Sequence, residues 1–210
     1  MVDSDIPDIP WPRKGDQLFR DDGGWLYNAC LNYLPYSDTL TLYADAYKRA
    51  GDLLIEYIKE KNRDKDLLVY PLVFLYRHYI ELRLKEIIRD GNQLLDISKK
   101  FPKHHRIDEL WKECKRILEE VEVPSKDLEA VEECILQFTE KDPISMAFRY
   151  PTDKKDNLSL PGLSHINLRN LAEVITRIGS LLDSASDGIS EYLYIKQEAE
   201  YEMAQMFRDI

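Results

Sequence analysis

The sequence has few of the residues that build turn-rich or disulfide-linked folds. It contains eight glycines in 210 residues, which is too few for an all-β fold with its many turns. Its three cysteines, Cys30, Cys114 and Cys134, are scattered, and none belongs to a CxxC pair. An odd and unpaired set of cysteines is typical of reduced thiols, so we expect a reducing compartment.

Long hydrophobic runs are also missing. The longest uncharged apolar run extends from Leu67 to Tyr76 and ends at Arg77, which is far short of the length that crosses a bilayer. The N-terminus is acidic and rich in proline, unlike a secretory signal peptide. We therefore expect a soluble, cytoplasmic protein with no membrane partner.

Several catalytic and cofactor motifs are absent. The sequence has no Gly-rich phosphate loop, no GxSxG and no HExxH. These absences give no support for a dinucleotide-binding site, a P-loop, a serine hydrolase or a zinc enzyme. We expect no cofactor and no metal. The net charge of -10 disfavours general binding to nucleic acid, and nothing in the sequence is specific to DNA. A small basic site remains compatible with this charge.

Helical periodicity dominates what is present. Apolar residues recur at helical spacing over most of the chain after residue 37, which predicts an all-α bundle of five or six helices. Residues 1–37 are punctuated by prolines and rich in aromatics, including Tyr33 and Tyr36. We expect this N-terminal arm to pack over the bundle or onto a second subunit. A disordered terminus is the alternative.

Caps and breakers predict the element bounds. The bundle domain is expected over 38–187, followed by an amphipathic C-terminal helix over 188–210 because Asp187-Gly188 should end the preceding helix. Pro71 is expected only in a first turn, and Gly91 should cap that helix. A long loop is expected over 142–163. The predicted helices are 38–62, 67–91, 108–120, 125–140 and 164–186.

The segment 66–91 combines the most apolar stretch of the chain with three polar residues. Arg77, His78 and Glu81 share one sector of the predicted helix, because residues three and four apart are neighbours on a helix surface. They form the one polar cluster that we expect to be buried. In a structural role, Glu81 would pair with Arg77 or another arginine, and His78 would donate a hydrogen bond to a backbone carbonyl. In a functional role, the three would line a pocket, with Arg77 binding an anion and His78 or Glu81 transferring protons.

Two distant segments offer partners for this cluster. His105 belongs to a basic run over residues 99–106 that carries no acid. The run is either a solvated loop or a phosphate site at a helix N-terminus. Arg149 lies between Phe148 and Tyr150, and its guanidinium is expected to reach Glu81 or Asp142. The candidate ligand site is therefore Arg77, His78, Glu81, His105 and Arg149. His165 is expected at the surface or in a cap.

The order of these pieces resembles the HEPN superfamily of small helical domains. The residues that carry the resemblance are LYRHYIELRLK at 75–85, Gly91, the pattern His105-x-Ile107-x-x-Leu110-Trp111, and FRYP at 148–151 before a long helix. It covers roughly residues 40–185. The resemblance implies a bundle of about four or five helices that often dimerises. Members act as metal-independent ribonucleases in defence or toxin–antitoxin systems, or bind nucleotides, RNA or proteins without catalysis.

The sequence departs from the superfamily in its catalytic motif. That motif is an arginine followed four to six residues later by a histidine, whereas Arg149 and His165 are much farther apart and Arg77 and His78 are adjacent. We therefore expect a non-catalytic or divergent domain that binds protein or RNA, and a homodimer built on the arm and the Met-rich tail. A ribonuclease using His78 or His105, and a nucleotide sensor using Arg77, His105 and Arg149, are the alternatives.

Overall fold

A computed structural model of the protein describes residues 11–20, 25–31 and 39–206. Contacts divide the chain into two units, Met1–Pro35 and Tyr36–Ile210. The first unit holds a turn closed by the Arg13 backbone N–H, which donates to Asp16 Oδ2 at 2.7 Å, and a short 3-10 helix, η1 (Trp25–Tyr27). Tyr33 and Tyr36 of the predicted arm lie outside the described residues, and the packing of the arm stays a prediction.

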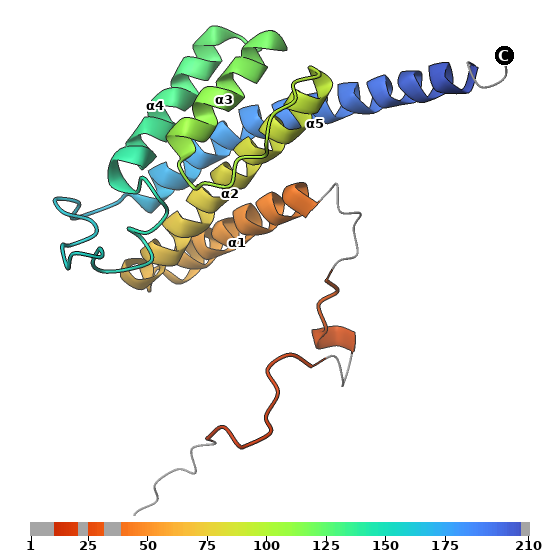
Figure 1. Ribbon diagram of the computed structural model, residues 1–210. Coiled ribbons are helices and arrows are strands. Elements are labelled where there is room, and N and C mark those ends of the chain that lie inside the picture. The colour runs from red at the N-terminus through yellow and green to blue at the C-terminus, as the bar shows by residue number, and fades with distance from the viewer. Residues whose placement is uncertain (1–10, 21–24, 32–38, 207–210) are drawn as a thin grey trace, which may run out of the picture. The chain divides into compact units, whose positions relative to one another are not determined.

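The second unit is an all-helical bundle, as the sequence predicts, and the described residues contain no named strand. α2 is its centre because it packs against α1, α3 and α5, while α4 packs on α3 (Figure 1). No helix within the described residues is long and apolar enough to span a membrane. The five helices are α1 (Thr39–Lys61), α2 (Lys65–Leu94), α3 (Ile107–Glu120), α4 (Ser125–Lys141) and α5 (Leu168–Met206).

α2 is buried along most of its length, and its bounds differ from those predicted. It begins at Lys65, so Pro71 lies in the second turn rather than the first. Proline has no N–H to donate to the carbonyl of Leu67. Leu67 and Pro71 are both exposed, so water can replace this hydrogen bond at little cost.

Gly91 does not end α2, which continues to Leu94, so the predicted C-terminal cap was wrong. Gly91 is instead buried where α3 crosses α2. A Cβ atom at this position would lie 2.3 Å from Cγ2 of Ile117, which no pair of carbon atoms tolerates. The glycine is therefore needed for a close approach between two helices and not for a left-handed backbone conformation.

α5 also differs from the prediction at both ends. It begins at Leu168 rather than near Ser164, and Asn167 Oδ1 accepts the backbone N–H of Asn170 at 3.1 Å as an N-terminal cap. The break predicted at Asp187-Gly188 is wrong, because α5 continues through it to Met206. Ile189 and Leu193 are buried on the face that packs on the bundle. Their burial outweighs the cost of about 1 kcal/mol for a glycine within a helix.

Candidate functional site

The five candidate residues fall into two neighbouring groups, each built on residues of α2 and one residue from a loop. Arg77 and Glu81 join the backbone and side chain of His105, which precedes α3. His78 lies in a cluster of rings, to which Arg149 is linked through Phe74. The structure thus brings Arg77, Glu81 and His105 into direct contact and places His78 and Arg149 beside them.

Arg77 is fully buried and its guanidinium is surrounded by acceptors. Its Nε donates to the carbonyl of Asp142 at 3.1 Å, Nη1 donates to Glu81 Oε2 at 3.2 Å, and Nη2 donates to the carbonyl of His105 at 2.8 Å. The carbonyl of Pro143 lies 3.4 Å from Nη2. Burial lowers the pKa of Arg77, and the charges of Asp142 and Glu81 oppose this. Arg77 therefore fastens two loops to α2, and its guanidinium is not accessible to an anion in solution.

Asp142 connects this network to the loop that carries Arg149. Its Oδ1 accepts the backbone N–H groups of Met146 at 2.7 Å and Ala147 at 3.0 Å, and its Oδ2 lies 3.6 Å from Arg77 Nε. The carboxylate is buried, so the ion pair with Arg77 and these hydrogen bonds offset its loss of water. The start of the loop is consequently held against α2.

Glu81 and His105 form the chemically distinctive pair of the site. Glu81 Oε1 lies 2.7 Å from His105 Nδ1 and 2.9 Å from Lys85 Nζ. Burial alone would raise the pKa of Glu81, but the hydrogen bonds and charges of Lys85 and His105 hold that pKa below its ordinary value. The carboxylate is fully buried, whereas the His105 side chain is 61% exposed. A carboxylate on Nδ1 orients the ring and leaves Nε2 for a ligand or solvent.

His78 is packed between two rings. Phe74 stacks on it with ring centroids 5.7 Å apart, and Tyr47 meets it edge-on at 4.4 Å. Burial lowers the pKa of His78. The charge of Glu81 opposes this, whereas the charges of Lys85 and His105 lower the pKa further. His78 thus belongs to an aromatic row on one face of α2, formed by Tyr70, Phe74 and His78 at four-residue spacing.

Arg149 lies over this row. Its guanidinium carbon is 5.4 Å from the ring centroid of Phe74 and 5.4 Å from that of Tyr150, within the range of cation–π attraction. The expectation that Arg149 reaches Glu81 or Asp142 was wrong: its Nη1 donates to the carbonyl of Ser145 at 3.3 Å. Arg149 is exposed, so its remaining donors are accessible.

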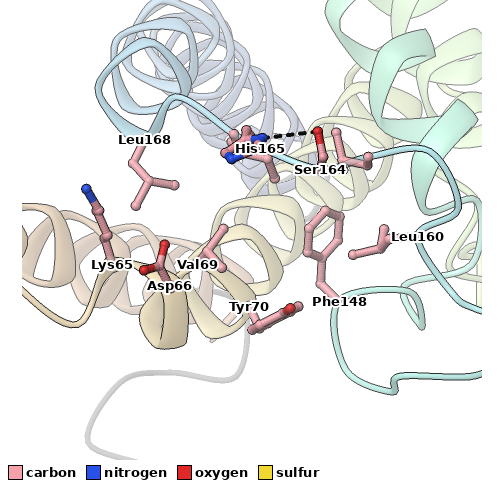
Figure 2. Close-up of a pocket in the computed structure, with 11 residues that line it drawn as sticks. Lys65, Asp66, Val69, Tyr70, Phe148, Leu160, Ser164, His165 and Leu168 are labelled. Carbon is pink, nitrogen blue, oxygen red and sulfur yellow. Dashed lines mark hydrogen bonds between the residues drawn. The ribbon is translucent and has the colours of Figure 1, made fainter.

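Two adjacent cavities separate α2 from the 142–167 loop. The cavity that contains Arg149 and Tyr150 has a volume of about 460 Å³. The other, of about 320 Å³, includes Lys65 and His165 in its lining. In Figure 2 residues of α2 line one side of this second cavity, and Phe148, Leu160 and His165 come from the opposite side. Both cavities are lined by Tyr70, Phe148, Leu160 and Leu163.

These shared residues make the two cavities parts of one cleft, which we call the α2–loop cleft. His165 is exposed there, as predicted, with Nδ1 3.1 Å from Ser164 Oγ. Lys65 and Tyr70, which line the cleft, and Phe74, which lies under Arg149, were not among the predicted site residues. The sequence did contain a signal for the two aromatics. Tyr70, Phe74 and His78 follow one another at intervals of four residues, which places them on the same helix face.

The basic run before α3 is largely paired with acids. Arg106 lies 3.0 Å from Asp108 and 3.2 Å from Glu109, and Lys99 lies 2.9 Å from Glu113. These contacts support the interpretation of the run as a solvated loop. Among the residues that the structure describes, no three His, Cys, Asp or Glu side chains gather in a way that would hold a metal ion.

A second buried polar cluster was not predicted. Arg83 lies 2.5 Å from Glu86, 2.6 Å from Asp45 and 2.9 Å from Asp183. Tyr79 donates to the same Asp183 at 2.8 Å. The expectation of a single buried cluster was therefore wrong. This second cluster joins α1, α2 and α5 and has no cavity lined by its residues among those described above, so we assign it a structural role.

No family model, no curated protein and no solved structure matches this chain.

Proposed function

We propose that this bundle binds single-stranded RNA in the α2–loop cleft, without cleaving it. The observation that carries the proposal is the position of Arg149, whose guanidinium lies 5.4 Å from the rings of both Phe74 and Tyr150. Unpaired bases stack on aromatic rings and on arginine, and such stacking contributes about 1–3 kcal/mol per base. The Tyr70 side chain is 50% exposed and adds a further ring along the cleft on which a base could stack.

The charge of the cleft agrees with a short binding site. Arg149 and Lys65 supply positive charge at separate parts of it, and Asp66 supplies one negative charge. Because the whole chain carries a net charge of -10, longer nucleic acid beyond the cleft would be repelled. Stacking therefore contributes more than phosphate contacts, and the resemblance to HEPN domains that bind RNA supports the same ligand class.

The binding proposal is tested by anisotropy titrations with a short, labelled, mixed-sequence RNA strand. Arg149→Ala should weaken binding about tenfold because it removes a stacking surface of the cleft, and Phe74→Leu should weaken it similarly because it removes the ring that holds Arg149 in place. Arg49→Ala is the matched control, because Arg49 is exposed on α1 and pairs with Glu56 at 3.2 Å. Two phosphate contacts predict a slope of log K against log salt of about -1.4. Absence of binding, or equal affinities for all variants, would contradict the proposal.

A metal-independent ribonuclease is the second candidate, favoured by the contact of 2.7 Å between Glu81 and His105. Nε2 of His105 would take the proton of a 2′-hydroxyl as the 2′-oxygen bonds to phosphorus. The 5′-oxygen would then leave and take a proton from His78 or water. Incubation of RNA with the protein in EDTA tests this activity. Cleavage that His105→Ala abolishes would support this activity. Uncut RNA would contradict it, and RNA binding would then be the remaining candidate function.

A further inference from the structure

α5 extends beyond the part of the bundle that buries it. Leu193 is its last buried residue, and Lys196 makes contacts just beyond, with Nζ 2.9 Å from the carbonyl of Leu94 and 2.6 Å from Asp96 Oδ1. Figure 1 shows the C-terminal part of α5 continuing past α2 and α3. A free helical end of this length is marginal in water, so a partner that covers it would stabilise it.

The extension carries an exposed apolar stripe. Tyr192, Ile195, Met203 and Met206 are all at least half exposed, at 64%, 53%, 50% and 62%. With Ala199 they recur at intervals of three and four residues, which places them on one side of the helix. Tyr194 and Tyr201 lie outside this stripe.

The same face of α5 lines a groove farther back in the bundle. Leu181, Ala185 and Gly188 continue the spacing toward the N-terminus of α5. Leu181 and Ala185 form one wall of a groove of about 730 Å³, whose other wall is Val131 and neighbouring residues of α4. An apolar stripe thus runs without a break from this α4–α5 groove onto the free end of α5.

We propose that the groove is filled by the C-terminal end of α5 from a second copy of this chain, in a two-fold antiparallel pair that crosses at Gly188. In this register residues 192–206 of one copy lie over residues 185–171 of the other. Tyr192 meets Ala185, and Met203 meets Val174. Large side chains of the tail thus face small or recessed ones, and the contact occurs twice because the interface is isologous.

Two observations favour a second copy as the occupant. A Cβ atom at Gly188 would have no atom of the described residues within 4 Å, so another helix can approach there closely. The tail is acidic, with Glu198 and Glu202 beside the stripe, whereas Arg177 lines the α5 wall of the groove and Asp127 lies on its α4 wall. The two-fold register places Arg177 between those two glutamates of the second copy, so the charges are complementary.

The length of the interface is sufficient for a stable dimer. The stripe from 171 to 206 is about 54 Å long at 1.5 Å per residue, and both copies contribute all of it. An interface of ordinary size buries about 800 Å² on each partner, which two helices in contact over this length provide when α4 also contacts the tail.

Light scattering after size exclusion, on the full chain at micromolar concentration, tests the proposal. The wild type should be a dimer, and Ile195→Asp should raise the dissociation constant at least about tenfold, because it buries an unpaired charge. Tyr194→Asp is the matched control: Tyr194 is exposed on a different side of the same turn, so the dimer should persist. Circular dichroism should show that the bundle stays folded in both variants, with any loss of helix in Ile195→Asp limited to the end of α5 that the partner no longer covers.

A charge exchange makes the test specific to this register. Arg177→Glu should weaken the dimer, and combining it with Glu198→Arg and Glu202→Arg should restore it. A monomeric wild type, a dimer that Ile195→Asp leaves unchanged, or a dimer lost only when residues 1–35 are deleted would each overturn the proposal. The RNA-binding residues lie elsewhere, so this result does not decide the proposed function.

Discussion

Nδ1 of His105 lies 2.7 Å from Oε1 of Glu81, although the carboxylate is fully buried and the imidazole is 61% exposed. The pair thus connects the interior of the bundle to its surface. Behind it, Arg77 binds the other oxygen of Glu81 at 3.2 Å and holds the backbone on both sides of the site. The structural and the functional interpretations of the cluster therefore apply to different members of it.

Removing the Arg77 guanidinium should destabilise the bundle strongly. Arg77→Met would leave the buried carboxylates of Glu81 and Asp142 without their shared partner, which costs about 3–5 kcal/mol in the free energy of unfolding. Urea denaturation followed by circular dichroism measures this loss. Arg49→Met, which removes an exposed ion pair with Glu56, should cost less than about 1 kcal/mol. Equal effects of the two changes would contradict the structural role of Arg77.

Glu81 should make stability depend on pH in the acidic range. Because its pKa in the folded state lies below its ordinary value of 4.5, folding favours the ionised carboxylate. The resulting stabilisation is fully present above about pH 4.5 and is lost as pH falls through the folded-state pKa. The difference in unfolding free energy between the wild type and Glu81→Gln should shrink below this pH. A difference that grows on acidification would show that the sign is wrong.

Gly91→Ala tests the close approach of α2 and α3. Alanine favours a helix over glycine by about 1 kcal/mol, but the new Cβ would lie 2.3 Å from Ile117 Cγ2. The cost of overpacking should exceed the gain in helix propensity, so the change should lower the free energy of unfolding by about 1–3 kcal/mol. In an Ile117→Ala background the same change should be neutral or stabilising, which a double-mutant cycle from urea denaturation measures. A Gly91→Ala protein as stable as wild type would contradict the packing described here.

Local sequence patterns predicted the bounds of the shorter helices better than those of α2 and α5. α3 and α4 bury one stripe each, so apolar spacing and nearby breakers such as Pro124 predicted their bounds to within one residue. The bounds of α2 and α5 depend instead on tertiary packing, which carries α2 past Gly91 and α5 past Gly188. Gly91, which packs against Ile117, and Gly188, which precedes the buried residues Ile189 and Leu193, have the same local signal as a cap, so both predictions were wrong.

The site was predictable only in part for the same reason. Burial and four-residue spacing predicted the pair of Arg77 and Glu81, and its structural role followed from the cost of a buried charge. Local sequence does not specify which loop returns to α2, so the stacking of Arg149 on Phe74 was missed. Arg83 was missed as well, because its partners Asp45 and Asp183 come from distant helices.

The most direct measurement of the RNA-binding function is photocrosslinking of a short RNA strand containing 4-thiouridine, with the attached peptides identified by mass spectrometry. The account predicts crosslinks at the exposed aromatic rings of the α2–loop cleft, Tyr70 and Tyr150, and at Phe74 beside them. These crosslinks should disappear when unlabelled RNA competes. Crosslinks confined to the lysines of the 99–106 run, or the absence of any specific crosslink, would contradict it.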